Sequence, residues 1–274
     1  MEYPRCLVQS SPKKKGVQAI ERGCSILDLL GKGKQTYSIS DLASELDLPK
    51  PTVHRMLTTF CRFGYVNQDE ISKEYRLGFQ LVELGQAVLD RIDVRKEAEP
   101  CLHRLAARVQ ETVHLAILDE HEIVYLEKVE RMDDPKGLRM ASRVGMRIFA
   151  HCCAVGKVLL AFLPDKRKTE ILSEKGLPRL TENTISDIER MLEHLKMVEQ
   201  QGYAVDDEEN EVGIRCVAAP VRNDRGKVIA GISISGPTVR MSLKRIHREL
   251  KTEVMKTAAE VSSKLGYRPM REGR

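Results

Sequence analysis

The segment spanning residues 39–77 constrains the fold most, because short elements of different kinds follow one another there in a set order. Apolar residues recur at helical spacing at its start, namely Ile39, Leu42, Ala43 and Leu46. This short helix is expected to begin near Ser40, whose hydroxyl can accept hydrogen bonds from the free amides of a first turn. After a turn over residues 47–50, Pro51 suits the first position of another helix, where its missing N–H would have no partner. The pattern predicts two short helices joined by a tight turn.

The second of these helices has one apolar and one polar face. Val53, Met56, Leu57 and Phe60 stand at i, i+3, i+4 and i+7 and form a single buried stripe. The other face offers short hydroxyls and cations, which can reach base edges or phosphates in a major groove. With one lysine from the preceding turn and one from the hairpin that follows, the candidate DNA-binding residues are Lys50, Thr52, His54, Arg55, Thr58, Thr59, Arg62 and Lys73.

Elements on both sides complete the arrangement. An amphipathic helix over residues 17–30 precedes the pair, and strand-like segments 65–68 and 74–77 flank a polar tip after it. Three helices followed by a hairpin make the winged variant of the helix-turn-helix, whose second motif helix enters the DNA groove. We therefore predict a winged helix-turn-helix DNA-binding domain over residues 17–78. The alternative is a small helical domain that binds protein, with the polar face only solvated.

A further apolar stripe predicts a linker helix over residues 79–95. It consists of Leu81, Val82, Gly85, Val88, Leu89 and Ile92. Such a stripe must be covered, and our hypothesis is that it packs against the same helix of a partner chain. The alternative is that it packs within its own chain, since a stripe alone does not identify its partner.

Residues 96–270 predict a second domain that mixes strands and helices. Segments 112–118 and 123–129 are strand-like around a polar turn, and segments 217–222 and 227–235 form another hairpin around a turn-favouring sequence. Helices are expected at about 97–110, 154–163, 186–201 and 238–265. The fold class is α+β.

Several segments, spread over roughly residues 17–267, resemble the motifs of a known protein family. They are Pro51–Leu57, Gly64–Val66, Tyr75–Gly78, His151–Ala161, Asp206–Asn210, Gly213–Ala218 and Ile232–Pro237. They are similar to the motifs of the IclR (isocitrate lyase regulator) family of bacterial transcription regulators. The resemblance implies a winged helix-turn-helix joined by a helix to a GAF-like effector-binding domain, in which an antiparallel sheet is flanked by helices. It also implies a homodimer or dimer of dimers on a double-stranded DNA operator, which two-fold symmetry makes roughly palindromic.

The resemblance further implies that a small organic acid modulates operator binding, with repression the favoured mode. The effector-binding positions that it implies are Ala154, Val155, Asp206, Ile214, Cys216, Ser233 and Ser235. Ser233 and Ser235 share one face of a strand, and their hydroxyls need partners if buried. The helix that opens at Ala154 presents free N–H groups to a carboxylate. We favour a hydroxy- or sugar-derived acid or an aromatic acid. The alternative is that the serines satisfy each other and that Cys216 is a small buried apolar residue.

The composition excludes some other classes of protein. No stretch approaches the ~18 to 20 apolar residues of a membrane span, and residues 1–16 are expected to be a disordered basic tail, not a signal peptide. We therefore expect a cytoplasmic protein that does not associate with membranes. Seven cysteines without a CxxC pair predict reduced thiols, with no structural metal and no cofactor. The net charge of +5 permits nucleic-acid binding without proving it.

Two competing hypotheses concern the cysteines. An enzyme would use Cys152 or Cys153 as a nucleophile beside His151, or the acidic run 206–209 as acid and base, but no third orienting group is visible and we expect no enzyme. In the other hypothesis the protein still binds DNA through its N-terminal part, but the second domain responds to a different signal. It is a metal- or redox-responsive regulator that uses His151, Cys152, Cys153 and Cys216.

Overall fold

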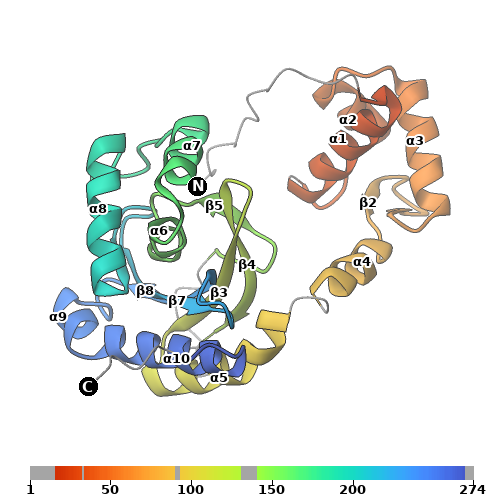
Figure 1. Cartoon of the computed structure of the whole chain (residues 1–274). Coiled ribbons are helices and arrows are strands. Elements are labelled where there is room, and N and C mark those ends of the chain that lie inside the picture. Colours follow the sequence, from red (N-terminus) through yellow and green to blue (C-terminus); the bar gives the residue numbers. More distant parts are fainter. Residues whose placement is uncertain (1–15, 33, 90–92, 131–140, 269–274) are drawn as a thin grey trace, which may run out of the picture. The chain divides into compact units, whose positions relative to one another are not determined.

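The chain forms two compact units, Met1–Val88 and Leu89–Arg274 (Figure 1). The structure, a computed structural model, describes residues 16–32, 34–89, 93–130 and 141–268. The basic tail expected over residues 1–16 lies outside the described residues except for Gly16.

The first unit contains three helices and a two-stranded wing. They are α1 (Gln18–Lys32), α2 (Ile39–Glu45), α3 (Lys50–Arg62), β1 (Val66–Gln68) and β2 (Tyr75–Leu77). The two strands pair antiparallel, and Tyr37 adds an isolated bridge to Tyr75. Apolar side chains from all five elements make one core, whose buried members include Ile26, Leu42, Val53, Leu57 and Val66. The element order confirms the predicted winged helix-turn-helix.

Two details of the helix starts were wrong. The N-cap of α2 is Ser38 and not Ser40: its Oγ accepts from the Asp41 amide at 3.1 Å, and the Asp41 carboxylate accepts from the Ser38 amide at 3.1 Å. A reciprocal cap of this kind satisfies two free amides, and it requires an acidic residue three positions on, which Asp41 supplies. Helix α3 begins at Lys50, so Pro51 is its second residue. The amide of a second helical position has no intrahelical partner either, so proline is tolerated there.

The segment predicted as one linker helix divides differently. Helix α4 spans Gln80–Leu89, and α5 starts at Asp93 and runs to Val109, earlier than the residue 97 expected from sequence. Between them, residues 90–92 lie outside the described residues. On α4, Val82 is 66% and Leu84 is 45% exposed, while Leu81 is half-buried. Val82 of the expected stripe is therefore uncovered in this chain, and so is Leu84, which the stripe did not include.

A curved antiparallel sheet organises the second unit. In order across the described part of the sheet, its strands are β5 (Arg147–Phe149), β4 (Glu122–Val129), β3 (Thr112–Asp119), β8 (Val228–Pro237), β7 (Ile214–Arg222) and β6 (Ala204–Asp207). The two predicted hairpins, β3–β4 and β7–β8, lie next to each other because β3 pairs with β8. The short outer strands β5 and β6 were not predicted.

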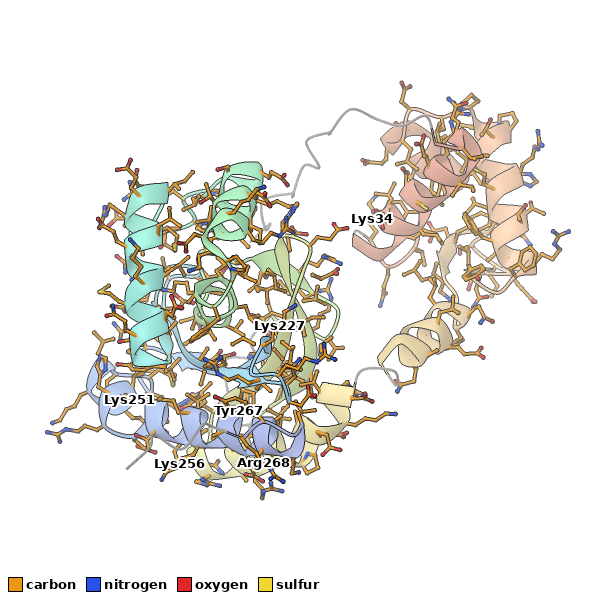
Figure 2. All side chains as sticks on the ribbon, in the orientation of Figure 1. Lys34, Lys227, Lys251, Lys256, Tyr267 and Arg268 are labelled. Carbon is orange, nitrogen blue, oxygen red and sulfur yellow. The ribbon has the colours of Figure 1, made fainter. Side chains whose placement is uncertain are left out.

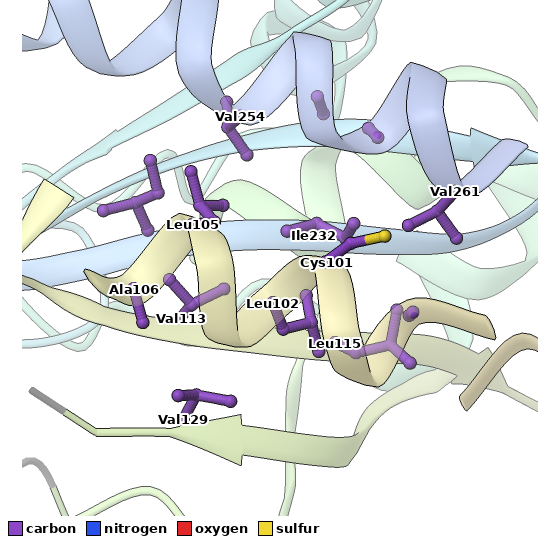
Figure 3. Packing of buried hydrophobic residues seen from close by; sticks show 14 of the residues in the cluster. Cys101, Leu102, Leu105, Ala106, Val113, Leu115, Val129, Ile232, Val254 and Val261 are labelled. Carbon is purple, nitrogen blue, oxygen red and sulfur yellow. The ribbon is translucent and has the colours of Figure 1, made fainter. Parts of the chain in front are cut away.

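Helices cover both faces of this sheet. On one face lie α5 and α10 (Lys251–Lys264), side by side in Figure 1, and the close view in Figure 3 shows their side chains meeting the strands. On the other face lie α6 (Ala154–Ala161), α7 (Asp165–Lys175) and α8 (Ile188–Gln201). Helix α7 was not predicted. The helix expected over 238–265 proves to be a short α9 (Leu243–Arg245) capped by Ser242, a π-helical turn (Ile246–Leu250) and then α10.

Charged side chains lie on the outside of this two-sided arrangement. Lys251 and Lys256, labelled in Figure 2, belong to α10, and the ammonium of Lys251 lies 5.4 Å from the centre of the Tyr203 ring. The ring of Tyr267, also labelled, has its centre 5.9 Å from the Arg222 guanidinium. Tyr267 lies next to the end of the described residues. The resulting α+β unit matches the predicted fold class. No helix in the described ranges is long and apolar enough to cross a membrane.

Alternation along the strands assigns each side chain to one of the two layers. Val113, Leu115, Ile232 and Ile234 belong to the core beneath α5 and α10. Ala116 and Ala218 belong to the core beneath α6. Because neighbouring strand residues point to opposite faces, Ser233, Ser235 and the other residues in phase with these alanines face α6.

Two glycines permit α6 to lie close to its surroundings. A Cβ on Gly231 would come within 2.7 Å of Val155 Cγ2, and a Cβ on Gly156 would come within 2.2 Å of the Ala150 carbonyl oxygen. Gly231 therefore lets Val155 in the first turn of α6 lie directly on β8, and Gly156 lets α6 lie close to the backbone of Ala150 before it.

Candidate functional site

The polar face of α3 is presented to solvent as a continuous surface. Among the predicted DNA-binding residues, Lys50, His54, Arg55, Thr58, Thr59, Arg62 and Lys73 are exposed and Thr52 is half-buried. Val53 and Leu57 on the opposite side are fully buried and fix the rotation of the helix. The helix can therefore offer cations and hydroxyls to a nucleic acid without disturbing its own core.

Local hydrogen bonds orient part of this surface. The hydroxyl of Thr58 donates to the His54 carbonyl at 2.9 Å, and that of Thr59 donates to the Arg55 carbonyl at 3.0 Å. Both hydroxyl oxygens keep lone pairs with which to accept further hydrogen bonds. Lys73 lies apart from α3, in the turn of the wing, with a left-handed backbone (φ 59°) next to strand β2.

In the second unit, a polar row crosses the sheet on the face toward α6. Asp206 on β6 stands opposite Cys216 on β7, which stands opposite Ser235 on β8. Ser233 lies two residues along the same face of β8. Asp206, Ser233 and Ser235 are all buried, so the structure brings these predicted effector-binding residues together under α6.

The remaining predicted positions border this row. Ala154 and Val155 form the first turn of α6, whose amides have no partners within the helix and carry its positive dipole end. The residue before them, Cys153, gives the helix no side-chain cap. Ile214 starts β7 on the same face as Cys216 and is buried. Hydroxyls and the free amides of a helix start are groups that can bind a small anion.

Burial changes the protonation of the central carboxyl. It raises the pKa of Asp206 to about 7, although the positive charge of Lys157 and a hydrogen bond from the Glu209 amide act in the opposite direction. That amide donates to Asp206 Oδ1 at 2.7 Å. Near neutral pH a large fraction of Asp206 is therefore protonated and can donate a hydrogen bond to a ligand.

A buried ion pair holds the loop after β6 against α6. Lys157 is completely buried, and its Nζ donates to the Val205 carbonyl at 2.5 Å and to Glu209 Oε1 at 2.5 Å. The Thr184 hydroxyl donates to the Glu209 carbonyl at 2.6 Å from the other side. The position of Asp206 relative to the start of α6 thus depends on contacts that sequence reasoning did not identify.

Sequence reasoning also missed the polar residues on β3 and β4, which lie on the same face of the sheet beyond β8. His114 on β3 stands opposite Ser233, and Lys128 on β4 stands opposite His114. His114 Nε2 lies 2.8 Å from Ser142 Oγ, and Lys128 Nζ donates to the Ser142 carbonyl at 2.7 Å. The only signal in the sequence was a histidine and a lysine in phase with the inward positions of two apolar strands.

The cysteines near the site are neutral thiols. Burial raises the pKa of Cys152, Cys153 and Cys216 above the ordinary value, and the Asp206 carboxylate contributes in the same direction. A thiol with a raised pKa is a weak nucleophile and a poor redox sensor. His151 Nε2 lies 3.1 Å from the Pro178 carbonyl. Within the described part of the chain, no three His, Cys, Asp or Glu side chains come together to hold a metal ion, so the metal-sensing hypothesis gains no support.

An exposed recognition helix, a wing and a second α+β unit define the class of winged helix-turn-helix DNA-binding regulators. Family comparison agrees: the IclR helix-turn-helix domain matches residues 19–70, and the bacterial transcriptional regulator IclR C-terminal domain matches residues 86–263. The chain belongs to the IclR family of bacterial transcriptional regulators.

Curated relatives align over nearly the whole chain. The HTH-type transcriptional regulator KdgR of Dickeya chrysanthemi is 40% identical over 252 residues, which cover 92% of this chain and 81% of the relative. The HTH-type transcriptional repressor AllR of Salmonella paratyphi A is 35% identical over 256 residues, which cover 93% of each protein. These relatives are transcription regulators and not enzymes.

Solved structures show the same fold. The Thermotoga maritima IclR structure is 34% identical, with a TM-score of 0.76 and coverage of 90% of this chain and 98% of that chain. An IclR homologue from Microbacterium hydrocarbonoxydans, solved in complex with 4-hydroxybenzoate, is 26% identical, with a TM-score of 0.78 and coverage of 90% and 99%.

Proposed function

We propose that this regulator binds operator DNA through α3 and the wing, and that a small organic acid bound beneath α6 modulates that binding. The observation that supports an acid as the ligand is the buried row Asp206–Cys216–Ser235. This row faces the uncapped start of α6. The hydroxyl of Ser235 and the carboxyl of Asp206, when protonated, can both hydrogen-bond a carboxylate with hydroxyl substituents. The 4-hydroxybenzoate complex of the homologue supports an organic acid as the chemical class. The protein would act in the cytoplasm, as a repressor like its relatives of the AllR type.

The domain roles follow from this proposal. Residues 17–78 would contact DNA through Lys50, the polar face of α3 and Lys73, while residues 96–270 would bind the effector. Residues 79–95 would join them and contribute to a dimer, for which a palindromic operator is the natural partner. The large apolar side chains exposed on α4 support a partner helix there.

The effector hypothesis is tested on the full-length protein with a panel of keto, hydroxy, sugar-derived and aromatic acids. A ligand that binds only the folded state raises the melting temperature, and the same acid should change the affinity for operator DNA. Replacing both Ser233 and Ser235 with alanine should abolish the response to the acid and leave DNA binding intact. The exposed serine of α7, in Ser173→Ala, is the matched control. If the double variant responds like the wild type, the site assignment is wrong.

The dimer hypothesis has a separate test. The substitutions Val82→Asp and Leu84→Asp place charges on the exposed face of α4, so the mass measured by light scattering should fall toward that of a monomer. Ile71→Asp is the control, because Ile71 is 95% exposed in the wing and lies outside α4. An unchanged mass in the α4 variants would show that this helix packs within its own chain.

A further inference from the structure

The polar face beneath α6 continues past Ser233 onto the next strand. His114 on β3 pairs in register with Ser233, and the neighbouring inward residue of β3, Ala116, lies in the core under α6. Adjacent strands are ~4.8 Å apart, so His114 lies about one strand spacing beyond the serines. A ligand that contacts the start of α6 and β8 needs little additional length to reach this histidine.

The His114 side chain is buried with one nitrogen unpaired. It is 1% exposed, Nε2 lies 2.8 Å from Ser142 Oγ, and no described residue provides a hydrogen-bond partner for Nδ1. Burial, followed by the positive charge of Lys128, lowers the pKa of His114 to about 3, so the ring is neutral. A neutral imidazole has one nitrogen that donates and one that accepts, and leaving either unpaired inside a protein costs stability.

Tyr125 connects His114 with the residues near Asp206. Its ring packs on the imidazole with the two ring centres 4.7 Å apart. Burial raises the pKa of Tyr125, and the charges that Cys153, Cys216 and Asp206 carry when ionised raise it further. Tyr125 therefore packs against the imidazole with its ring, and its ionisation is sensitive to charge at the Asp206 end of the face.

We propose that His114 is a specificity-determining contact of the effector site, where Nδ1 hydrogen-bonds a hydroxyl of the ligand remote from its carboxylate. This inference rests on the proposed function. The class of ligand is an aliphatic acid with several hydroxyls, because Asp206, Ser233, Ser235 and His114 present polar groups along the whole face. An aromatic ring without a hydroxyl would offer no hydrogen-bonding group to the unpaired Nδ1 of His114, and a short acid would not reach it.

The test compares two substitutions at His114 in the full-length protein. His114→Phe keeps a flat ring against Tyr125 and removes both nitrogens, whereas His114→Asn is smaller and retains a polar amide close to the position of Nδ1. With five- and six-carbon aldonates such as D-gluconate as probes, calorimetric titration should show at least a tenfold loss of affinity in His114→Phe and a smaller loss in His114→Asn. A packing role predicts the opposite order. His194→Phe on α8 is the matched control and should change affinity less than twofold.

A second measurement requires no variant and covers the case in which substitutions at His114 do not fold. The wild-type protein should bind the best aldonate at least tenfold more tightly than hexanoate, which has the six-carbon skeleton without hydroxyls, and more tightly than lactate. Equal affinity for hexanoate or lactate, or selective binding of an aromatic acid, would overturn the inference while leaving an acid-binding site in place. If no acid of any class binds, the proposed function itself fails.

Discussion

At the scale of single residues, the carboxyl of Asp206 makes the charge of the candidate site depend on pH. Its pKa of about 7 in the folded protein lies above the ordinary value of 3.8, so folding takes up a proton at this position. The stability that it contributes is fully present below about pH 4 and is lost as the pH rises through about 7. The same ionisation places a negative charge next to a bound carboxylate.

We therefore expect the affinity for the acid effector to fall about five- to tenfold between pH 6 and pH 8, since one pKa unit corresponds to about 1.4 kcal/mol. Calorimetric titration at the two pH values measures this loss. In Asp206→Asn the affinity should be nearly independent of pH, because the amide does not ionise. If this variant loses as much affinity as the wild type, another group is responsible for the pH dependence.

At the scale of the element, the reciprocal cap of α2 is a local device with a measurable contribution. Ser38→Ala removes the hydroxyl that accepts from the Asp41 amide, and the loss of an N-cap costs about 1 kcal/mol. For a unit of this size, the melting temperature should fall by about 4 to 8 °C. Ser44→Ala, at an exposed position inside the same helix, is the control and should change stability by less than about 0.5 kcal/mol. Similar losses in both variants would argue against the cap.

A second prediction at this scale concerns DNA binding by helix α3. Arg55 stands in the middle of its exposed polar face. Arg55→Ala should weaken binding to an operator fragment recovered by selection from random DNA, by about 1 to 3 kcal/mol if the guanidinium contacts a base. Fluorescence anisotropy at fixed salt measures the loss. Arg190→Ala, on exposed α8 of the other unit, removes the same charge and should have little effect. Equal losses of affinity in both variants would show that only the overall charge of the protein matters, and not a contact between Arg55 and DNA.

At the scale of the whole molecule, each unit has a hydrophobic core of its own. Scanning calorimetry of the full chain should therefore show two unfolding transitions. A bound acid at about 100 times its dissociation constant adds about 2.7 kcal/mol and should raise only the transition of the larger unit, by about 5 to 10 °C. Ser38→Ala should lower only the other transition. A single transition that moves with both changes would show that the units unfold together.

The sequence by itself determined the order of the elements and the faces of the helices. Periodicity is a local property, so the buried stripe and the exposed cations of α3 were predictable from spacing alone, and so were the two central hairpins. Helix α7 and strands β5 and β6 were missed because they are short or weakly amphipathic, and packing against neighbours stabilises them more than their own pattern does.

Only the tertiary structure decided that the two hairpins are neighbours and where the outer strands pair, and the chemistry of the site depends on these pairings. Pairing of β3 with β8 brings His114 beside Ser233, and pairing of β6 with β7 brings Asp206 beside Cys216. His114 and Ser233 are far apart in the chain, and neither cross-strand pair has a local signature in the sequence. Burial then makes His114 neutral and raises the pKa of Asp206, because a charged group loses its solvation when the folded chain surrounds it. Residue types and their faces are therefore local information, whereas their protonation and their partners exist only in the folded protein.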